Sequence, residues 1–156
     1  MALLLATSLL AACGPQQPTP ALPAQPTQAT ARVGDVTVRA SLVPTESLGG
    51  EVAARHGIAR EPGTVLLLVG VRRGEGAAET SLPSAVRASV TDLRGRTRQL
   101  PLRELRSDAA PGEPLLDYAG TIQVSPPDTL RFEISVDWGG PGRSTTMQLQ
   151  RDFPHP

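Results

Sequence analysis

The sequence predicts an all-β protein, an immunoglobulin-like β-sandwich of about seven antiparallel strands with one short helix. Two observations lead to this prediction. Apolar and polar residues alternate with a period of two over most of residues 32–156, which is typical of strands that bury one face. Turn residues such as Gly, Pro and Asp recur between these segments at intervals of about 8 to 15 residues. Because the chain has one cysteine, the disulfide of true immunoglobulin domains is excluded, and only the architecture is predicted.

Six of the expected strands show this alternation. The clearest is residues 130–138, where Leu, Phe, Ile, Val and Trp alternate with polar residues. The seventh, residues 65–71, is apolar throughout, so both of its faces should be covered. Pro101 lacks an N–H donor, which favours a sheet edge for the strand around it. The alternating segments are residues 36–42, 86–90, 100–102, 116–124, 130–138 and 147–153.

The one departure from period two begins at Thr45 and ends at Gly57. Thr45 can serve as a helix N-cap, and Gly57 suits the left-handed conformation that ends a helix. Leu48 and Val52 are four residues apart and would share one helical face. We therefore expect one short helix here, covering the outer face of the strand at 65–71.

The N-terminal residues 1–12 form a short apolar block that ends in small residues just before Cys13. This is the build of a secretory signal peptide, and the block is too short to span a bilayer as a helix. Its last residues, Leu-Ala-Ala-Cys, resemble the lipobox of bacterial lipoproteins, in which the cysteine receives acyl chains and becomes the mature N-terminus. Gly14 then favours sorting to the periplasmic face of the outer membrane over the inner membrane. The alternative is an ordinary signal peptide with a chance cysteine.

Residues 13–31 are expected to be a tether. Nothing in residues 1–31 is charged, and prolines recur at positions 15, 18, 20, 23 and 26 among Gln, Thr and Ala. Such a segment buries too little apolar surface to offset the entropy of ordering it, and its prolines favour extended backbone. The remaining residues, 32–156, are the size of one domain. The predicted organisation is a signal peptide, a lipid-anchored tether and a β-sandwich.

The residue types needed for most enzyme chemistry are scarce. His56 and His155 are the only histidines, and no Cys/His cluster could bind zinc, so neither a metal nor another cofactor is expected. His56 falls in the last turn of the expected helix, where a cation is favoured by the helix dipole, and we expect it to be structural. Hydrolysis by a carboxylate pair is the alternative that stays open. The candidate carboxylates are Asp117, Glu104, Glu133 and Asp137.

A run of arginines is the best candidate for a binding surface. Residues 92–95 predict a hairpin turn, and the arginines after it are spaced two apart, so on a strand they would share one face. Such a stripe could dock anionic lipid headgroups or an acidic envelope protein, and the alternative is a solvated edge hairpin that resists aggregation. We also expect Arg60 and Glu104 to pair across the sandwich. The arginines are Arg94, Arg96 and Arg98, followed by Arg103 and Arg106.

Several segments together resemble the envelope protein family known as domain of unknown function 4426. The match extends over about residues 35–153, and the sequence departs from the family pattern at His56 and Asp92. The resemblance implies an exported protein of Gram-negative bacteria, sometimes lipid-anchored, with no assigned activity and no catalytic residues. The segments are residues 42–45, 51–60, 65–71, 92–96, 102–105 and 130–136.

The composition narrows the possible functions further. The formal net charge is zero and aromatic residues are 3% of the chain, which disfavours nucleic-acid binding. We expect a non-enzymatic binding module of the periplasm, held to a membrane through Cys13. The alternatives are a carrier or chaperone that holds an apolar ligand between the two sheets and, less probably, a hydrolase.

Overall fold

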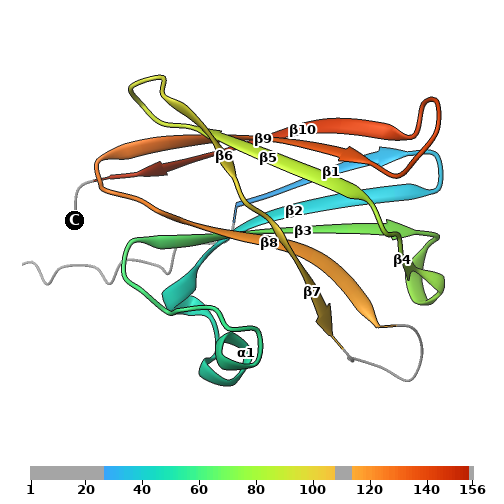
Figure 1. Cartoon of the computed structure of the whole chain (residues 1–156), viewed down its shortest axis with the longest axis horizontal. Coiled ribbons are helices and arrows are strands. Elements are labelled where there is room, and N and C mark those ends of the chain that lie inside the picture. Colours follow the sequence, from blue (N-terminus) through green and yellow to red (C-terminus); the bar gives the residue numbers. More distant parts are fainter. Residues whose placement is uncertain (1–26, 108–113, 155–156) are drawn as a thin grey trace, which may run out of the picture.

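The computed structural model describes residues 27–107 and 114–154, which form two antiparallel sheets packed face to face (Figure 1). This confirms the predicted sandwich, with ten strands in the described residues rather than about seven. The six-stranded sheet has the order β1 (Thr27–Val33), β2 (Val36–Pro44), β3 (Thr64–Arg73), β8 (Leu115–Gln123), β7 (Arg103–Ser107), with the short β4 (Thr80–Ser81) paired to β3. The four-stranded sheet has the order β10 (Ser144–Phe153), β9 (Asp128–Asp137), β5 (Ala85–Thr91), β6 (Thr97–Leu100).

The boundary expected between tether and domain is wrong by several residues. Strand β1 begins at Thr27 and pairs along its whole length with β2, although residues 27–31 carry no charge and were assigned to the tether. The run of prolines ends at position 26, so the backbone after it has N–H groups that can pair with β2. From Thr27 the side chains of β1 alternate between half-buried and exposed. The proposed signal peptide, Cys13 and His155 lie outside the described residues.

The expected single helix is two shorter pieces. A 3₁₀ turn, η1 (Thr45–Ser47), is separated by extended backbone at Leu48 from α1 (Gly50–Arg55). The N-cap positions of η1 and α1 are Pro44 and Gly49, and neither makes a side-chain cap hydrogen bond. Thr45 is the first residue of η1, and its hydroxyl instead binds the backbone of Glu61. Gly57 does adopt the predicted left-handed conformation, with φ of 57°. None of the helices described is long and apolar enough to cross a membrane.

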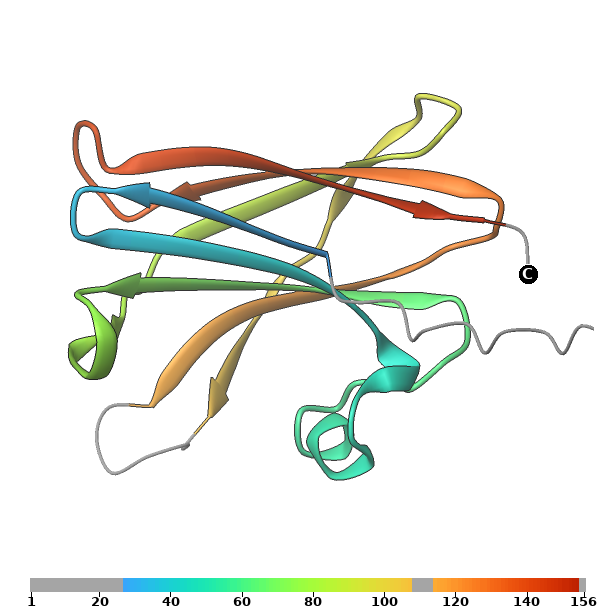
Figure 2. The same ribbon diagram turned by 180° about the vertical axis from the view of Figure 1, so that it is seen from behind.

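Buried side chains cover β3 on both faces, as predicted. Between the sheets lies the main core, whose largest fully buried members are Phe132, Leu42, Leu67, Leu130 and Ile134. On the outer face of the six-stranded sheet, Leu66 packs in a second cluster with Ala53 of α1 and its neighbours. Figure 2 shows α1 on the side of this sheet that faces away from the other sheet. The helix therefore covers β3, but it does so through Ala53, which is buried. Val52, expected on the same helical face as Leu48, is 48% exposed.

The chain changes sheets between β6 and β7. β6 is an edge of the four-stranded sheet and β7 an edge of the six-stranded sheet, so Pro101 and Leu102 connect the two instead of lying inside one edge strand. This crossing passes close to Gly120 of β8, where a Cβ atom would lie 2.5 Å from the Pro101 carbonyl oxygen. A side chain at position 120 is therefore incompatible with this crossing.

Candidate functional site

The hairpin tip, defined as residues 92–98, is fixed by the Asp92 side chain. The Gly95 N–H donates to the Asp92 carbonyl at 2.9 Å, which confirms the predicted turn, and Gly95 has φ of 77°. The Asp92 carboxylate accepts the backbone N–H of Arg96 at 2.9 Å and of Arg94 at 3.0 Å. These bonds, led by that from the Arg96 backbone, hold the pKa of Asp92 below its ordinary value. The tip is therefore a preformed turn.

The arginines expected to form one stripe do not lie on one strand, because only Arg98 of the first three belongs to β6. Arg96 is held by an ion pair with Asp92 at 2.8 Å, and Arg94 belongs to the turn. Arg94 and Arg98 are exposed, and their side chains make no ion pair with any residue the structure describes. Arg103 is on β7, in the other sheet, because the chain crosses between sheets after β6. The free cations of the tip are therefore Arg94 and Arg98.

The expected pair between Arg60 and Glu104 is wrong. Arg60 donates to the backbone carbonyl of Glu46 at 2.7 Å, and Glu104 accepts from Arg106 at 3.0 Å. The reason is the alternation of β7: Leu105 faces the cluster around α1, so its neighbour Glu104 points the other way. Arg60 supports the loop before α1 instead.

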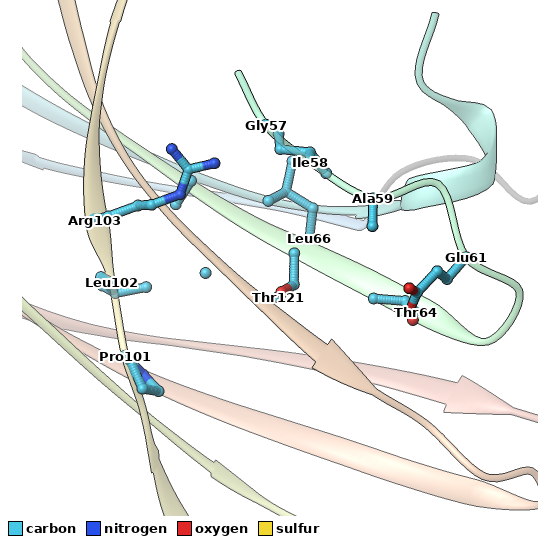
Figure 3. A pocket seen from close by; sticks show the side chains of 12 residues that line it. Gly57, Ile58, Ala59, Glu61, Thr64, Leu66, Pro101, Leu102, Arg103 and Thr121 are labelled. Carbon is cyan, nitrogen blue, oxygen red and sulfur yellow. The ribbon is translucent and has the colours of Figure 1, made fainter. Parts of the chain in front are cut away.

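A hollow of about 460 Å³ lies on the outer face of the six-stranded sheet. One wall is the segment 57–61 after α1, the other is the crossing segment 101–103, and the floor comes from β3 and β8 (Figure 3). We call it the outer hollow. It brings together two residues singled out from the sequence, Gly57 and Arg103, which are far apart in the chain.

Polar groups lie at different sides of the outer hollow. The Arg103 guanidinium donates to the backbone carbonyl of His56, which directly follows α1. In Figure 3 Arg103 stands on one side, whereas Thr64 and Glu61 lie together on another. Thr64 is 8% exposed, and its Oγ1 has no hydrogen-bond partner within the described residues. Sequence patterns gave no signal for Thr64, because a polar residue at the start of a strand is unremarkable.

The four candidate carboxylates do not form a catalytic pair. Glu104 and Asp117 belong to the six-stranded sheet, and Glu133 and Asp137 belong to the four-stranded sheet. Each has its own partner: Arg106, Arg72, the Gln148 amide and the Gly139 N–H, respectively. Within residues 27–107 and 114–154, no group of three His, Cys, Asp or Glu side chains is placed to hold a metal ion.

Comparison with known proteins gives a family and a fold. A family model described as domain of unknown function 4426 (DUF4426) matches residues 30–154. The crystal structure of a DUF4426 family protein from Pseudomonas aeruginosa PAO1 superposes with a TM-score of 0.64 and 22% identity, over 82% of this chain and 95% of that one. FetP from uropathogenic Escherichia coli, expressed recombinantly in the periplasm, gives 0.57 and 9% identity over 83% and 95%. No curated protein matches the sequence.

Proposed function

This chain belongs to the DUF4426 family, and from that premise and the geometry above we propose that it is a lipid-anchored, non-enzymatic binding module of the periplasm. Cys13 carries the acyl chains at the outer membrane. The hairpin tip then docks on the anionic headgroups of the membrane to which the chain is anchored.

The observation that carries this proposal is that β1 begins on the side of the sandwich toward the hairpin tip and runs away from it to the β1–β2 turn. Thr27 pairs with Leu42, close to where β2 ends, and the adjacent strands place the end of β8 there too. The loop after β8 leads to Asp128, whose carboxylate accepts the backbone N–H of Leu93 at 2.9 Å. In Figure 2 the tip and the β8–β9 connection lie at one end, and the β1–β2 and β9–β10 turns lie at the other.

The length of the segment before β1 keeps this end near the membrane. Residues 14–26, thirteen in all, separate Cys13 from Thr27 and can span at most about 45 Å when fully extended. A lipid on Cys13 therefore keeps the tip within reach of the headgroups. The tip itself carries a net positive charge, because Arg94, Arg96 and Arg98 outnumber the carboxylates of Asp92 and Asp128. Asp92 is paired with Arg96, whereas Arg94 and Arg98 make no ion pair among the described residues.

The expected strength of docking is modest but sufficient. Each arginine near an anionic surface contributes about 1 kcal/mol, so Arg94 and Arg98 together contribute about 2 kcal/mol. Leu93, 66% exposed at the same tip, adds apolar contact. Because the domain is already tethered, docking takes place at high effective concentration and needs no greater affinity.

The first test concerns the anchor. Cells grown with radiolabelled palmitate should yield labelled wild-type protein and unlabelled Cys13→Ser protein. An unlabelled wild type would refute the lipid anchor and remove the basis for the orientation.

The second test concerns the tip. The full lipidated chain carrying Leu93→Cys, labelled with a fluorophore, is placed in nanodiscs of phosphatidylcholine with or without phosphatidylglycerol. We expect headgroup quenchers to reach the fluorophore only with phosphatidylglycerol, and the effect to disappear with Arg94→Ser and Arg98→Ser together. The matched control is Arg87→Ser with Arg143→Ser, an equal charge change away from the tip, which should leave quenching unchanged.

A second label position completes the tip experiment. Ser144→Cys places the fluorophore at the opposite end of the sandwich, where no quenching is expected. Equal quenching at both ends, or quenching that ignores lipid charge, would overturn the docking proposal. Crosslinking of the tip to an acidic envelope protein, independent of lipid charge, would also overturn it.

The carrier hypothesis placed an apolar ligand between the two sheets. The inner faces there are filled by side chains such as Phe132, Leu67 and Ile134, all fully buried. The outer hollow is instead on the far side of the six-stranded sheet, under α1 and the crossing segment.

A further inference from the structure

We propose that the outer hollow binds a short apolar peptide, with the C-terminal carboxylate of the peptide held by Arg103. This site is distinct from the hairpin tip and does not depend on membrane anchoring. Its size, its two polar ends and the edge of β8 that β7 leaves unpaired each point to this ligand.

The hollow has the size and the apolar floor of a ligand site. Its volume, about 460 Å³, falls in the usual range of about 300 to 1,000 Å³ for small-ligand pockets. The floor is made by Leu66 and Ala119, and Ile58 and Leu102 contribute apolar surface from the two walls. An apolar side chain of the ligand would contact all four.

Arg103 supplies the anion-binding end. Its guanidinium has five N–H donors, and the bond to the His56 carbonyl uses one of them and fixes its position. The neighbouring acid Glu104 is taken by Arg106, and no described carboxylate pairs with Arg103. Two of the remaining donors can bind a carboxylate side by side, which is the strong geometry for this pair of groups.

The far end suits a hydrogen-bond donor of the ligand. The buried Thr64 hydroxyl, which can donate or accept, has no partner among the described residues, and leaving such a group unsatisfied costs about 1–3 kcal/mol. Glu61 lies beside it and adds a carboxylate, so an N–H group is the ligand part that suits both residues. The amide or amine of a peptide provides this group, whereas the methyl end of a fatty acid provides none.

The edge of β8 explains why the ligand should be extended. β7 pairs with β8 only as far as Ala119, and residues 120–123 pair with β3 alone among the strands described. Gly120 and Thr121, on that unpaired stretch, line the hollow. An extended peptide could add main-chain hydrogen bonds there, as in other cases of strand addition to a sheet edge.

The first arm of the experiment tests the carboxylate end. The full chain in phosphatidylcholine nanodiscs is titrated calorimetrically with trileucine and with its C-terminal amide. We expect Arg103→Gln to weaken trileucine binding about tenfold or more, and the wild type to prefer trileucine over the amide by a similar factor. Arg131→Gln, the same change at an exposed position of β9 in the other sheet, is the control and should bind as the wild type does.

The second arm tests the far end. Thr64→Val should weaken trileucine binding about fivefold without lowering the urea midpoint, because the lost hydroxyl has no partner in the free protein. Decanoate has the same carboxylate and no N–H group. It should bind more weakly than trileucine, and Thr64→Val should leave its affinity unchanged. Thr146→Val, on β10 of the other sheet, is the control for the substitution itself.

Three outcomes would overturn this proposal. These are trileucine binding that Arg103→Gln leaves unchanged, decanoate binding as tightly as trileucine, and no measurable binding of trileucine to the wild type at millimolar concentration. Urea midpoints of all variants identify any that lose binding through unfolding. Arg55→Gln removes a cation from the end of α1 that makes no ion pair with any residue the structure describes, and it checks that net charge alone is not responsible.

Discussion

Two buried threonines allow one substitution to be tested with opposite expected results. The Thr45 hydroxyl is fully buried, donates to the Glu61 carbonyl and accepts the Glu61 N–H, each at 3.1 Å. The Thr64 hydroxyl is almost as buried and has no partner in the described residues. Valine has the same shape as threonine without the hydroxyl, so it removes two hydrogen bonds at position 45 and none at position 64.

The magnitudes follow from these partners. A typical hydrogen bond contributes about 1 kcal/mol net, and the Glu61 N–H would be left without its partner, so Thr45→Val should destabilise by about 2–3 kcal/mol. Thr64→Val removes a buried hydroxyl that makes no bond, so stability should stay constant or rise by about 1 kcal/mol. The same chemical change therefore separates the two variants by about 3 kcal/mol.

Urea denaturation followed by circular dichroism measures this difference. With a slope of about 2 kcal/mol per molar urea, the midpoint of Thr45→Val should fall by about 1 M, and that of Thr64→Val should not fall. An unchanged slope would show that the unfolded states are comparable. A similar loss in both variants would refute the reasoning, because it would mean that the Thr64 hydroxyl has a bonding partner in solution.

Four further predictions concern the crossing, the hairpin tip, the second cluster and the exposed face of α1. Gly120→Ala should destabilise by about 3 kcal/mol in urea denaturation, because the new Cβ would meet the crossing backbone at 2.5 Å, and an unchanged midpoint would contradict that contact. The folded pKa of Asp92 lies below its unfolded value of about 3.9. The stabilisation from Asp92 is therefore present above pH about 4 and is lost as pH falls through the folded pKa. Asp92→Asn should make the free energy of unfolding depend less on pH in this acidic range. Leu66→Ala should cost about 2–4 kcal/mol by thermal or urea unfolding, because Leu66 is 4% exposed under α1. Val52→Ala, on the exposed face of α1, should cost less than about 0.5 kcal/mol, and a larger loss would mean that Val52 is covered in solution.

Sheet strands with one strongly apolar face were predictable from the sequence. In β9, Phe132 and Ile134 are fully buried and Arg131 and Glu133 are exposed, as the alternation indicates. β1 was missed because its inward residues are small or polar, such as Thr27 and Ala29, and the alternation carries little hydrophobic contrast. The alternation of apolar and polar residues identifies a strand that buries much apolar surface. It misses a strand that is stabilised mainly by pairing with its neighbour.

The helix cap shows where local rules give way to tertiary contacts. Thr45 has the right side chain for an N-cap, yet its hydroxyl is used across the loop by Glu61, sixteen residues away. The same holds for the candidate site. Arg103 was expected in a stripe with Arg98, but the two belong to different sheets, and the grouping of Arg103 with Thr64 depends on contacts between segments distant in sequence.

The crossing at Pro101 links the fold to the outer hollow. A residue that leaves one sheet before joining the next has a backbone N–H that fits neither ladder, and proline removes that donor without leaving it unpaired. The close approach of the crossing is possible because Gly120 has no side chain. Pairing between β7 and β8 therefore ends at Ala119, short of the end of β8. The unpaired edge at residues 120–123 and the hollow beside it are consequences of the same crossing. A variant that straightens this connection should lose the peptide site together with the sheet change, even with Arg103 and Thr64 in place.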